Sequence, residues 1–240
     1  MIGIMGALEE EVSLYISKAE IETFETYAGM KFYRGKLCEK LAVIVRTGVG
    51  KVNAAIAAQI LIDRYNIDRM IFTGLAGALV PYLQQGDLVV ANYLVQYDVD
   101  LTAFGRRVGE VPSVGRMIEA DSEMLKQVTD AYDAVFAGMS NRPQMIVGTV
   151  VSGDRFISDR KTIAWLQREF GAVATEMEGA AIAQVCQMND KPFLVIRTIS
   201  DSAAEDAPEE FESALKSAPE NAFNLLQNML SSDRMEKAVV

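Results

Sequence analysis

Apolar residues follow two patterns along the chain, short continuous runs and longer stretches with helical spacing. Runs rich in β-branched residues predict strands at Ile2–Met5, Lys31–Leu37, Leu41–Arg46, Arg69–Thr73, Asp87–Val95, Gln144–Val151, Ala172–Thr175 and Phe193–Ile199. Apolar positions three and four residues apart predict helices at Glu9–Ser17, Val52–Tyr65, Asp121–Phe136, Ile163–Phe170, Gly179–Asn189 and Phe211–Leu230. Alternation of this kind is typical of an α/β protein with a mostly parallel sheet between helices.

The length of 240 residues suits one domain. We therefore expect a single three-layer α/β/α domain over residues 1–230, with a mixed, mostly parallel central sheet. The sheet is mixed because Cys38-Glu39-Lys40 joins two adjacent strand runs as a hairpin. Residues 97–112 form a long irregular segment, which indicates a functional loop or an interface. Ser231–Val240 is expected to be a frayed tail.

Composition and charge narrow the class of protein. No apolar run is long enough to span a bilayer, and the N-terminus lacks the basic region of a signal peptide. Cys38 and Cys186 form no CxxC motif, which favours reduced thiols in a cytoplasmic protein. The net charge of −10 argues against nucleic acid or an anionic membrane as a partner.

The chain contains no histidine, which excludes several kinds of chemistry. A Ser-His-Asp triad, a Cys-His pair and an imidazole-based zinc site are impossible. Proton transfer must therefore come from Asp, Glu, Lys, Tyr or water, and we expect carboxylates to do this work.

Acidic residues follow three of the predicted strands. Asp201 ends the apolar run that begins at Phe193, the triplet Glu9–Glu11 follows Ile2–Met5, and Glu176 and Glu178 follow Ala172–Thr175. Ligands of open α/β sheets bind beyond the carboxyl ends of strands, so these acids are candidates for a site.

Each acidic group also has a structural interpretation. Ser200 or Asp201 suits a helix N-cap, and Thr175 with Glu178 matches a capping box. Acids in a first helical turn suit the helix dipole, which would account for at least two members of Glu9–Glu11. The turn Gly48-Val-Gly-Lys51 fails both the dinucleotide and the P-loop templates, so it predicts a tight turn rather than a cofactor site.

Five segments occur together in one order: Gly3–Val12, Thr47–Lys51, Val151–Ile157, Glu176–Glu178 and Arg197–Asp201. With them, residues 1 to about 230 resemble the 5′-methylthioadenosine/S-adenosylhomocysteine nucleosidases of the nucleoside phosphorylase superfamily. The resemblance implies hydrolysis of a purine N-glycosidic bond without a metal or organic cofactor, in a homodimer with a small-molecule nucleoside substrate.

The resemblance also implies roles for individual residues. Asp201 would be the general acid at purine N7, Glu11 would activate water, and Glu178 would bind the ribose hydroxyls. The remaining implied substrate-binding residues are Met177 on the ribose, Phe156 and Ile157 at the base, Val49, Leu8, Phe104 and Phe211 around the ribose and 5′-substituent, Glu176, Ser200, Leu75, and Pro112 in the pocket of a neighbouring subunit.

Glycoside cleavage with two carboxyl groups fits these residue types, and Asp201 would need a raised pKa to hold its proton near neutrality. One position departs from the family: Leu75 stands where the turn Thr-Gly-Ser-Ala-Gly usually has Ser. This departure strengthens the case for a futalosine hydrolase. A phosphorylase, or a non-catalytic nucleoside-binding protein on the same scaffold, would also be compatible with the fold that the resemblance implies.

Overall fold

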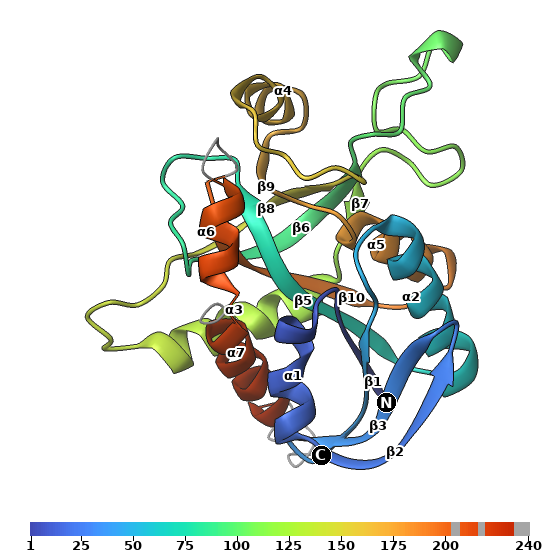
Figure 1. Ribbon diagram of the computed structural model, residues 1–240, viewed down its shortest axis with the longest axis vertical. Helices are drawn as coiled ribbons and strands as arrows, with labels where there is room; N and C mark the ends of the chain where they lie inside the picture. The colour runs from blue at the N-terminus through green and yellow to red at the C-terminus, as the bar shows by residue number, and fades with distance from the viewer. Residues whose placement is uncertain (203–206, 216–218, 233–240) are drawn as a thin grey trace.

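The computed structural model describes residues 1–202, 207–215 and 219–232. One sheet runs through the described part of the chain in the order β10-β6-β8-β9-β5-β1-β4-β3-β2, with β7 paired to β6 (Figure 1). Its strands are β1 (Ile2–Gly6), β2 (Glu20–Tyr27), β3 (Met30–Leu37), β4 (Lys40–Arg46), β5 (Arg69–Ala78), β6 (Leu88–Gln96), β7 (Ile118–Glu119), β8 (Met145–Ser152), β9 (Ala172–Glu176) and β10 (Phe193–Asp201).

The sheet is mixed, and one half of it closes on itself. Parallel ladders join β1 to β4 and β5, β5 to β10, and β8 to β6 and β9. Antiparallel ladders join β10 to β6, β5 to β9, β6 to β7, and β3 to its two neighbours. Because β10 pairs with both β5 and β6, the path β5-β10-β6-β8-β9 returns to β5 and forms a small barrel.

Helices cover both faces of the sheet. On one face, α1 (Glu9–Lys18), α3 (Ser122–Phe136) and α7 (Pro219–Ser232) share a buried apolar cluster with alternate strand residues. On the other face, α2 (Lys51–Tyr65) and α5 (Gly179–Met188) share a second cluster. The remaining helices are α4 (Arg160–Phe170), α6 (Ala207–Ala214) and the 3₁₀ turn η1 (Thr102–Phe104). The α/β fold that the sequence predicts is confirmed, and within the described ranges no helix is long and apolar enough to cross a membrane.

The predicted hairpin is present, and a further strand precedes it. β3 and β4 are joined by Cys38 and Glu39, which both have positive φ (50° and 62°), as a two-residue hairpin turn requires. The sequence pattern does not predict β2. This edge strand is mostly exposed on both faces, so it lacks the apolar alternation that identifies a strand.

The C-terminal prediction needs correction. The single helix expected over Phe211–Leu230 is wrong, because α6 ends at Ala214 and α7 begins at Pro219. Proline disfavours helical geometry in the residue before it but suits the first position of a helix, so it separates the two. Ser231 and Ser232 extend α7, whereas residues 233–240 of the expected tail lie outside the described residues.

Candidate active site

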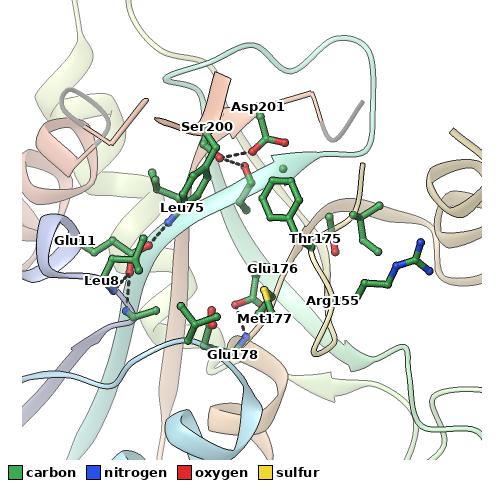
Figure 2. A pocket seen from close by; sticks show the side chains of 17 residues that line it. Leu8, Glu11, Leu75, Arg155, Thr175, Glu176, Met177, Glu178, Ser200 and Asp201 are labelled. Atoms are coloured by element: carbon green, nitrogen blue, oxygen red, sulfur yellow. Dashed lines mark hydrogen bonds between the residues drawn. The ribbon is translucent and has the colours of Figure 1, made fainter. Parts of the chain in front are cut away.

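A cavity of about 220 Å³ opens where β1, β9 and β10 end and where β5 passes through Leu75. Residues that are distant in the sequence come together around this one space (Figure 2). Of the residues predicted for a site, those that line it are Leu8, Glu11, Val49, Leu75, Phe156, Ile157, Glu176, Met177, Glu178, Ser200, Asp201 and Phe211.

Glu11 is the one buried member of its acidic triplet. Glu9 and Glu10 are exposed on the first turn of α1, while Glu11 faces the cavity with 4% of its surface accessible. Its carboxylate accepts backbone N–H bonds from Ala7 (2.6 Å), Leu8 (3.0 Å) and Leu75 (2.8 Å). Burial raises the pKa of Glu11, although the nearby Arg197 charge and these N–H bonds oppose the shift.

Arg197 lies at the centre of the acidic residues and is fully buried. Its Nη2 pairs with Glu176 and lies 3.3 Å from Oε2 of Glu178, while its guanidinium stacks 3.9 Å from the centroid of the Phe72 ring. Burial alone would lower the pKa of Arg197, but the charges of Glu176, Glu11 and Glu178 outweigh it and raise the pKa. Arg197 therefore stays cationic and compensates the carboxylates around it.

Gly74 is required by this close packing. A Cβ atom at position 74 would collide with the Arg197 guanidinium and with the Glu11 carboxylate. Any other residue would force these two groups apart. The turn that the sequence pattern predicts at Thr73–Gly77 is wrong, because these residues belong to β5 and pair with β10. Gly74 instead lets the β5 backbone lie against the charged cluster.

Both carboxylate oxygens of Glu176 accept hydrogen bonds from other groups in the chain. Glu176 accepts N–H bonds from Glu178 (3.0 Å) and Gly179 (2.8 Å), a bond from the Ser152 hydroxyl, and the Arg197 ion pair. The capping box expected from Thr175 and Glu178 is wrong. Thr175 belongs to β9, and α5 begins at Gly179 with Glu176 as the acceptor for its first N–H groups.

Glu178 reaches from the start of α5 to the turn before α2. Its Oε1 accepts the Gly50 N–H at 2.8 Å, so the glycine turn at 48–50 holds a carboxylate rather than a phosphate. Gly50 has φ 99°, which aims its N–H in this direction and suits only glycine without strain. Burial and the neighbouring Glu176 charge raise the pKa of Glu178 to about 8.

Asp201 lies away from this cluster, at the other end of the cavity (Figure 2). It is the last residue of β10, is 4% exposed, and accepts a 2.6 Å bond from the Ser200 hydroxyl. The rings of Phe156 and Phe211 meet edge to face nearby on the cavity wall, with centroids 5.9 Å apart. This end therefore combines a carboxyl group with aromatic surfaces.

Two predicted residues do not line this cavity. Phe104 and Pro112 lie on the loop between β6 and β7, which projects from the body in Figure 1. Phe104 is 81% exposed there. Phe104 therefore does not reach the cavity of its own chain, and its place at the ribose and 5′-substituent pocket stays a prediction, as does the place of Pro112 at a neighbouring subunit's pocket.

Sequence reasoning missed several residues of the site. Ala7, Ala76, Gly77, Arg155 and Thr175 line the cavity, and Arg197 supports it from behind. Arg197 carried a recognisable signal, because an arginine inside a buried strand run must find carboxylate partners. No group of His, Cys, Asp or Glu within the described ranges is arranged to hold a metal ion.

Comparisons with known proteins identify the family. The family model described as the phosphorylase superfamily matches residues 1–231. The 5′-methylthioadenosine/S-adenosylhomocysteine nucleosidase of Geobacillus thermodenitrificans is 38% identical over 229 residues, which cover 95% of each chain.

Two solved structures also match over nearly the whole chain. The Neisseria meningitidis 5′-methylthioadenosine/S-adenosylhomocysteine nucleosidase, in complex with methylthio-immucillin-A, has a TM-score of 0.91 at 34% identity and covers 96% of this chain and 98% of its own. The futalosine hydrolase of Helicobacter pylori has a TM-score of 0.90 at 31% identity, covering 96% and 97%. The chain belongs to the phosphorylase superfamily, within the family of the 5′-methylthioadenosine/S-adenosylhomocysteine nucleosidases.

Proposed function

We propose that this protein hydrolyses the N-glycosidic bond of 5′-methylthioadenosine and S-adenosylhomocysteine, releasing adenine and the 5-thio-substituted ribose. The observation that carries the proposal is the placement of two carboxyl groups at opposite ends of one cavity. Glu11 and Asp201 are both buried, and the cavity separates them (Figure 2). Glycoside cleavage needs one such group for the leaving group and another for the water.

In the proposed mechanism, the base lies between Phe156 and Phe211 with its N7 at Asp201. Asp201 donates a proton to N7 while the C1′–N9 bond breaks, so adenine leaves as a neutral molecule. In its ionised form, Glu178 accepts hydrogen bonds from the ribose hydroxyls and stabilises the positive charge that develops on the ring. Glu11 removes a proton from water as its oxygen bonds to C1′, and its raised pKa makes it a better base near neutral pH.

Hydrolysis is favoured over phosphorolysis by the charges around the cavity. Arg155 is the one cationic side chain among the described residues that line it, and Arg155 pairs with Asp159 at 3.0 Å. Arg197 lies behind the wall and is held by carboxylates. A phosphate dianion in this cavity would meet Glu11 and Glu178 without a free cation to balance it, whereas water carries no charge.

The test is to supply 5′-methylthioadenosine in phosphate-free buffer and identify the products. We expect adenine and free 5-methylthioribose at a rate that added phosphate does not increase. Strict dependence on phosphate, or a sugar 1-phosphate among the products, would replace the proposal with phosphorolysis. Binding without any product would instead support a nucleoside-binding protein.

Futalosine hydrolysis is the alternative, because the Helicobacter pylori futalosine hydrolase shares the fold at 31% identity. Leu75, which replaces the serine usual in the family, bears on this choice. Its backbone N–H donates to Glu11, and its side chain packs against Phe211 and Ala214. Since the backbone bond does not depend on the side chain, Leu75 leaves Glu11 in place and makes one wall apolar. Comparing kcat/KM for futalosine and 5′-methylthioadenosine decides between the two substrates.

We also propose a homodimer, located in the cytoplasm and acting in methionine salvage. The dimer is supported by large apolar side chains exposed on the β6–β7 loop, α2 and α5, namely Phe104 (81%), Val52 (69%) and Met188 (68%). Large apolar side chains exposed to this degree would be buried if these elements formed an interface. We place Pro112 at the partner's cavity.

The dimer is tested by Phe104→Asp. We expect a monomeric mass by light scattering and a lower kcat/KM, because the partner's loop would no longer complete the cavity. The control is Phe24→Asp, which alters an equally apolar side chain that is 58% exposed on the edge strand β2. A wild-type monomer with full activity would contradict the dimer.

A further inference from the structure

A second and larger hollow lies beside the candidate active site. It has a volume of about 770 Å³ and lies between the first turn of α1, the turn joining β2 to β3, and the turn joining β4 to α2. We call it the α1–β4 groove. Its charged lining consists of Glu9, Glu10, Lys31 and Arg46, and its polar lining includes Tyr33 and Asn53. The proposed hydrolysis of 5′-methylthioadenosine uses none of these residues.

The groove and the active-site cavity share a wall. Ala7, Leu8 and Val49 line both of them. Figure 2 shows Leu8 on the Glu11 side of the cavity, away from Asp201. If the base lies at Asp201 and the ribose at Glu178, the 5′ end of the substrate points to Leu8 and Val49. A long 5′-substituent would then pass this wall into the groove.

An open ion pair stands in the groove. Nη1 of Arg46 lies 3.3 Å from Oε2 of Glu9, and the two side chains are 57% and 62% exposed. Their position follows from the sheet, since Arg46 pairs with Gly6 at the ends of β4 and β1, just before α1. An exposed pair of this kind contributes little to folding, so its partners can exchange for others at little cost.

Arg46 is better placed than Lys31 to bind an anion in the groove. The Lys31 ammonium lies 5.4 Å from the centroid of the Phe24 ring, in a cation–π contact. Arg46 carries a planar guanidinium that binds carboxylates in a bidentate manner. Glu9 beside it supplies the opposite charge.

We propose that the α1–β4 groove binds the amino-acid end of S-adenosylhomocysteine, with its α-carboxylate on Arg46 and its α-ammonium on Glu9. This inference rests on the proposed function. An α-amino acid presents a carboxylate and an ammonium close together, which matches a guanidinium and a carboxylate held 3.3 Å apart. 5′-Methylthioadenosine has only a methyl group there, so it does not reach the pair. A tail with a carboxylate but no ammonium would be repelled by Glu9.

The test measures kcat/KM of the purified protein for S-adenosylhomocysteine and 5′-methylthioadenosine in Arg46→Gln and Glu9→Gln. We expect each variant to lower kcat/KM for S-adenosylhomocysteine about 3- to 10-fold through KM, as for a partly exposed charged contact. The ratio of the two substrates is the readout, because a general loss would lower both values equally.

Two thioether analogues of S-adenosylhomocysteine test which end of the amino-acid tail contacts Arg46 and which contacts Glu9. The 5′-S-(3-carboxypropyl) analogue keeps the carboxylate and lacks the amine, whereas the 5′-S-(3-aminopropyl) analogue keeps the amine. Arg46→Gln should weaken only the first, and Glu9→Gln should weaken only the second and improve the first. The control is Lys126→Gln, which removes an exposed cation paired with Asp130 on α3.

The outcomes separate the two proposals. Failure of the wild-type protein to hydrolyse 5′-methylthioadenosine would contradict the proposed function. Hydrolysis of 5′-methylthioadenosine with an unchanged substrate ratio in Arg46→Gln and Glu9→Gln would overturn the groove assignment alone. An equal change of the ratio in Lys126→Gln would also overturn it, since the effect would then come from net charge.

Discussion

Every carboxylate oxygen of Glu11, Glu176 and Glu178 is held by a backbone N–H, a hydroxyl or Arg197, whereas the Asp201 end of the cavity is walled by aromatic rings. The first region is a fixed array of charge around one guanidinium. The second places an acid beside Phe156 and Phe211, with Phe156 43% exposed. The difference fits the two tasks of the proposed mechanism, in which one end stabilises charge and orders water and ribose, and the other accepts a planar base and gives it a proton.

The largest expected effect comes from removing Arg197, the cation at the centre of the carboxylates. In Arg197→Met, the buried Glu11, Glu176 and Glu178 lose their compensating charge. We expect the free energy of unfolding to fall by about 3–5 kcal/mol, as when one partner of a buried ion pair is removed. Urea denaturation measures this loss. It should be greater at pH 8 than at pH 5, because the raised pKa values of Glu11 and Glu178 let them take up protons at the lower pH.

The control for this variant is Arg34→Met, which removes an exposed arginine from β3. Its cost should stay within about 0.5 kcal/mol, as for ordinary surface substitutions. Similar losses in both variants would mean that the charged cluster is not a distinct unit of stability.

The next effect concerns the aromatic end. Asp201→Asn keeps the shape of the side chain but removes its transferable proton, so we expect turnover of 5′-methylthioadenosine to fall at least ~10²-fold. Ser200→Ala should cause a smaller loss, because the Ser200 hydroxyl only orients Asp201 through its 2.6 Å bond. Asp130→Asn on the exposed face of α3 is the control. Near-wild-type turnover in Asp201→Asn would remove Asp201 from the mechanism.

The last effect is a dependence of stability on pH. Glu178 has an ordinary pKa of 4.5 and a folded-state pKa of about 8. Its contribution to stability is therefore present below pH 4.5 and is lost as the pH rises towards 8. Gln at this position cannot ionise. We expect the stability of Glu178→Gln relative to wild type to rise between pH 5 and pH 9.

Thermal unfolding at the two pH values measures this difference. The comparison with Glu123→Gln, an exposed acid in the first turn of α3, should show no such trend. A relative stability of Glu178→Gln that falls with pH would contradict the raised pKa.

The contrast between the two regions also shows what the sequence could predict. Asp201, Glu11 and Glu178 were recognisable because each follows a buried strand run, where the sheet exposes its carboxyl ends. The function of Glu176 was not recognisable from the local pattern. The pattern Thr175 to Glu178 matches a capping box, but three-dimensional pairing with Arg197 and β8 extends β9 through Glu176.

Further features of the fold depended on contacts that local patterns do not contain. β2 has no buried face, and Pro219 divides a continuous helical pattern into α6 and α7. The α1–β4 groove arises from the spacing of α1 and the β2–β3 turn, which no local motif specifies. The sequence thus predicted the fold and the acids, and tertiary packing determined how the acids are held.

The central claim, that the two ends of the cavity perform separate tasks, is tested most directly by changing the leaving group. A nitrophenyl 5-methylthioriboside releases the stable nitrophenolate anion. It therefore needs no proton from Asp201, but it still needs an activated water. We compare Asp201→Asn and Glu11→Gln on this substrate and on 5′-methylthioadenosine by following nitrophenolate and adenine release. The account predicts that Asp201→Asn regains near-wild-type rates on the nitrophenolate substrate while Glu11→Gln remains at least ~10²-fold slower. Recovery of both variants, or of neither, would contradict it.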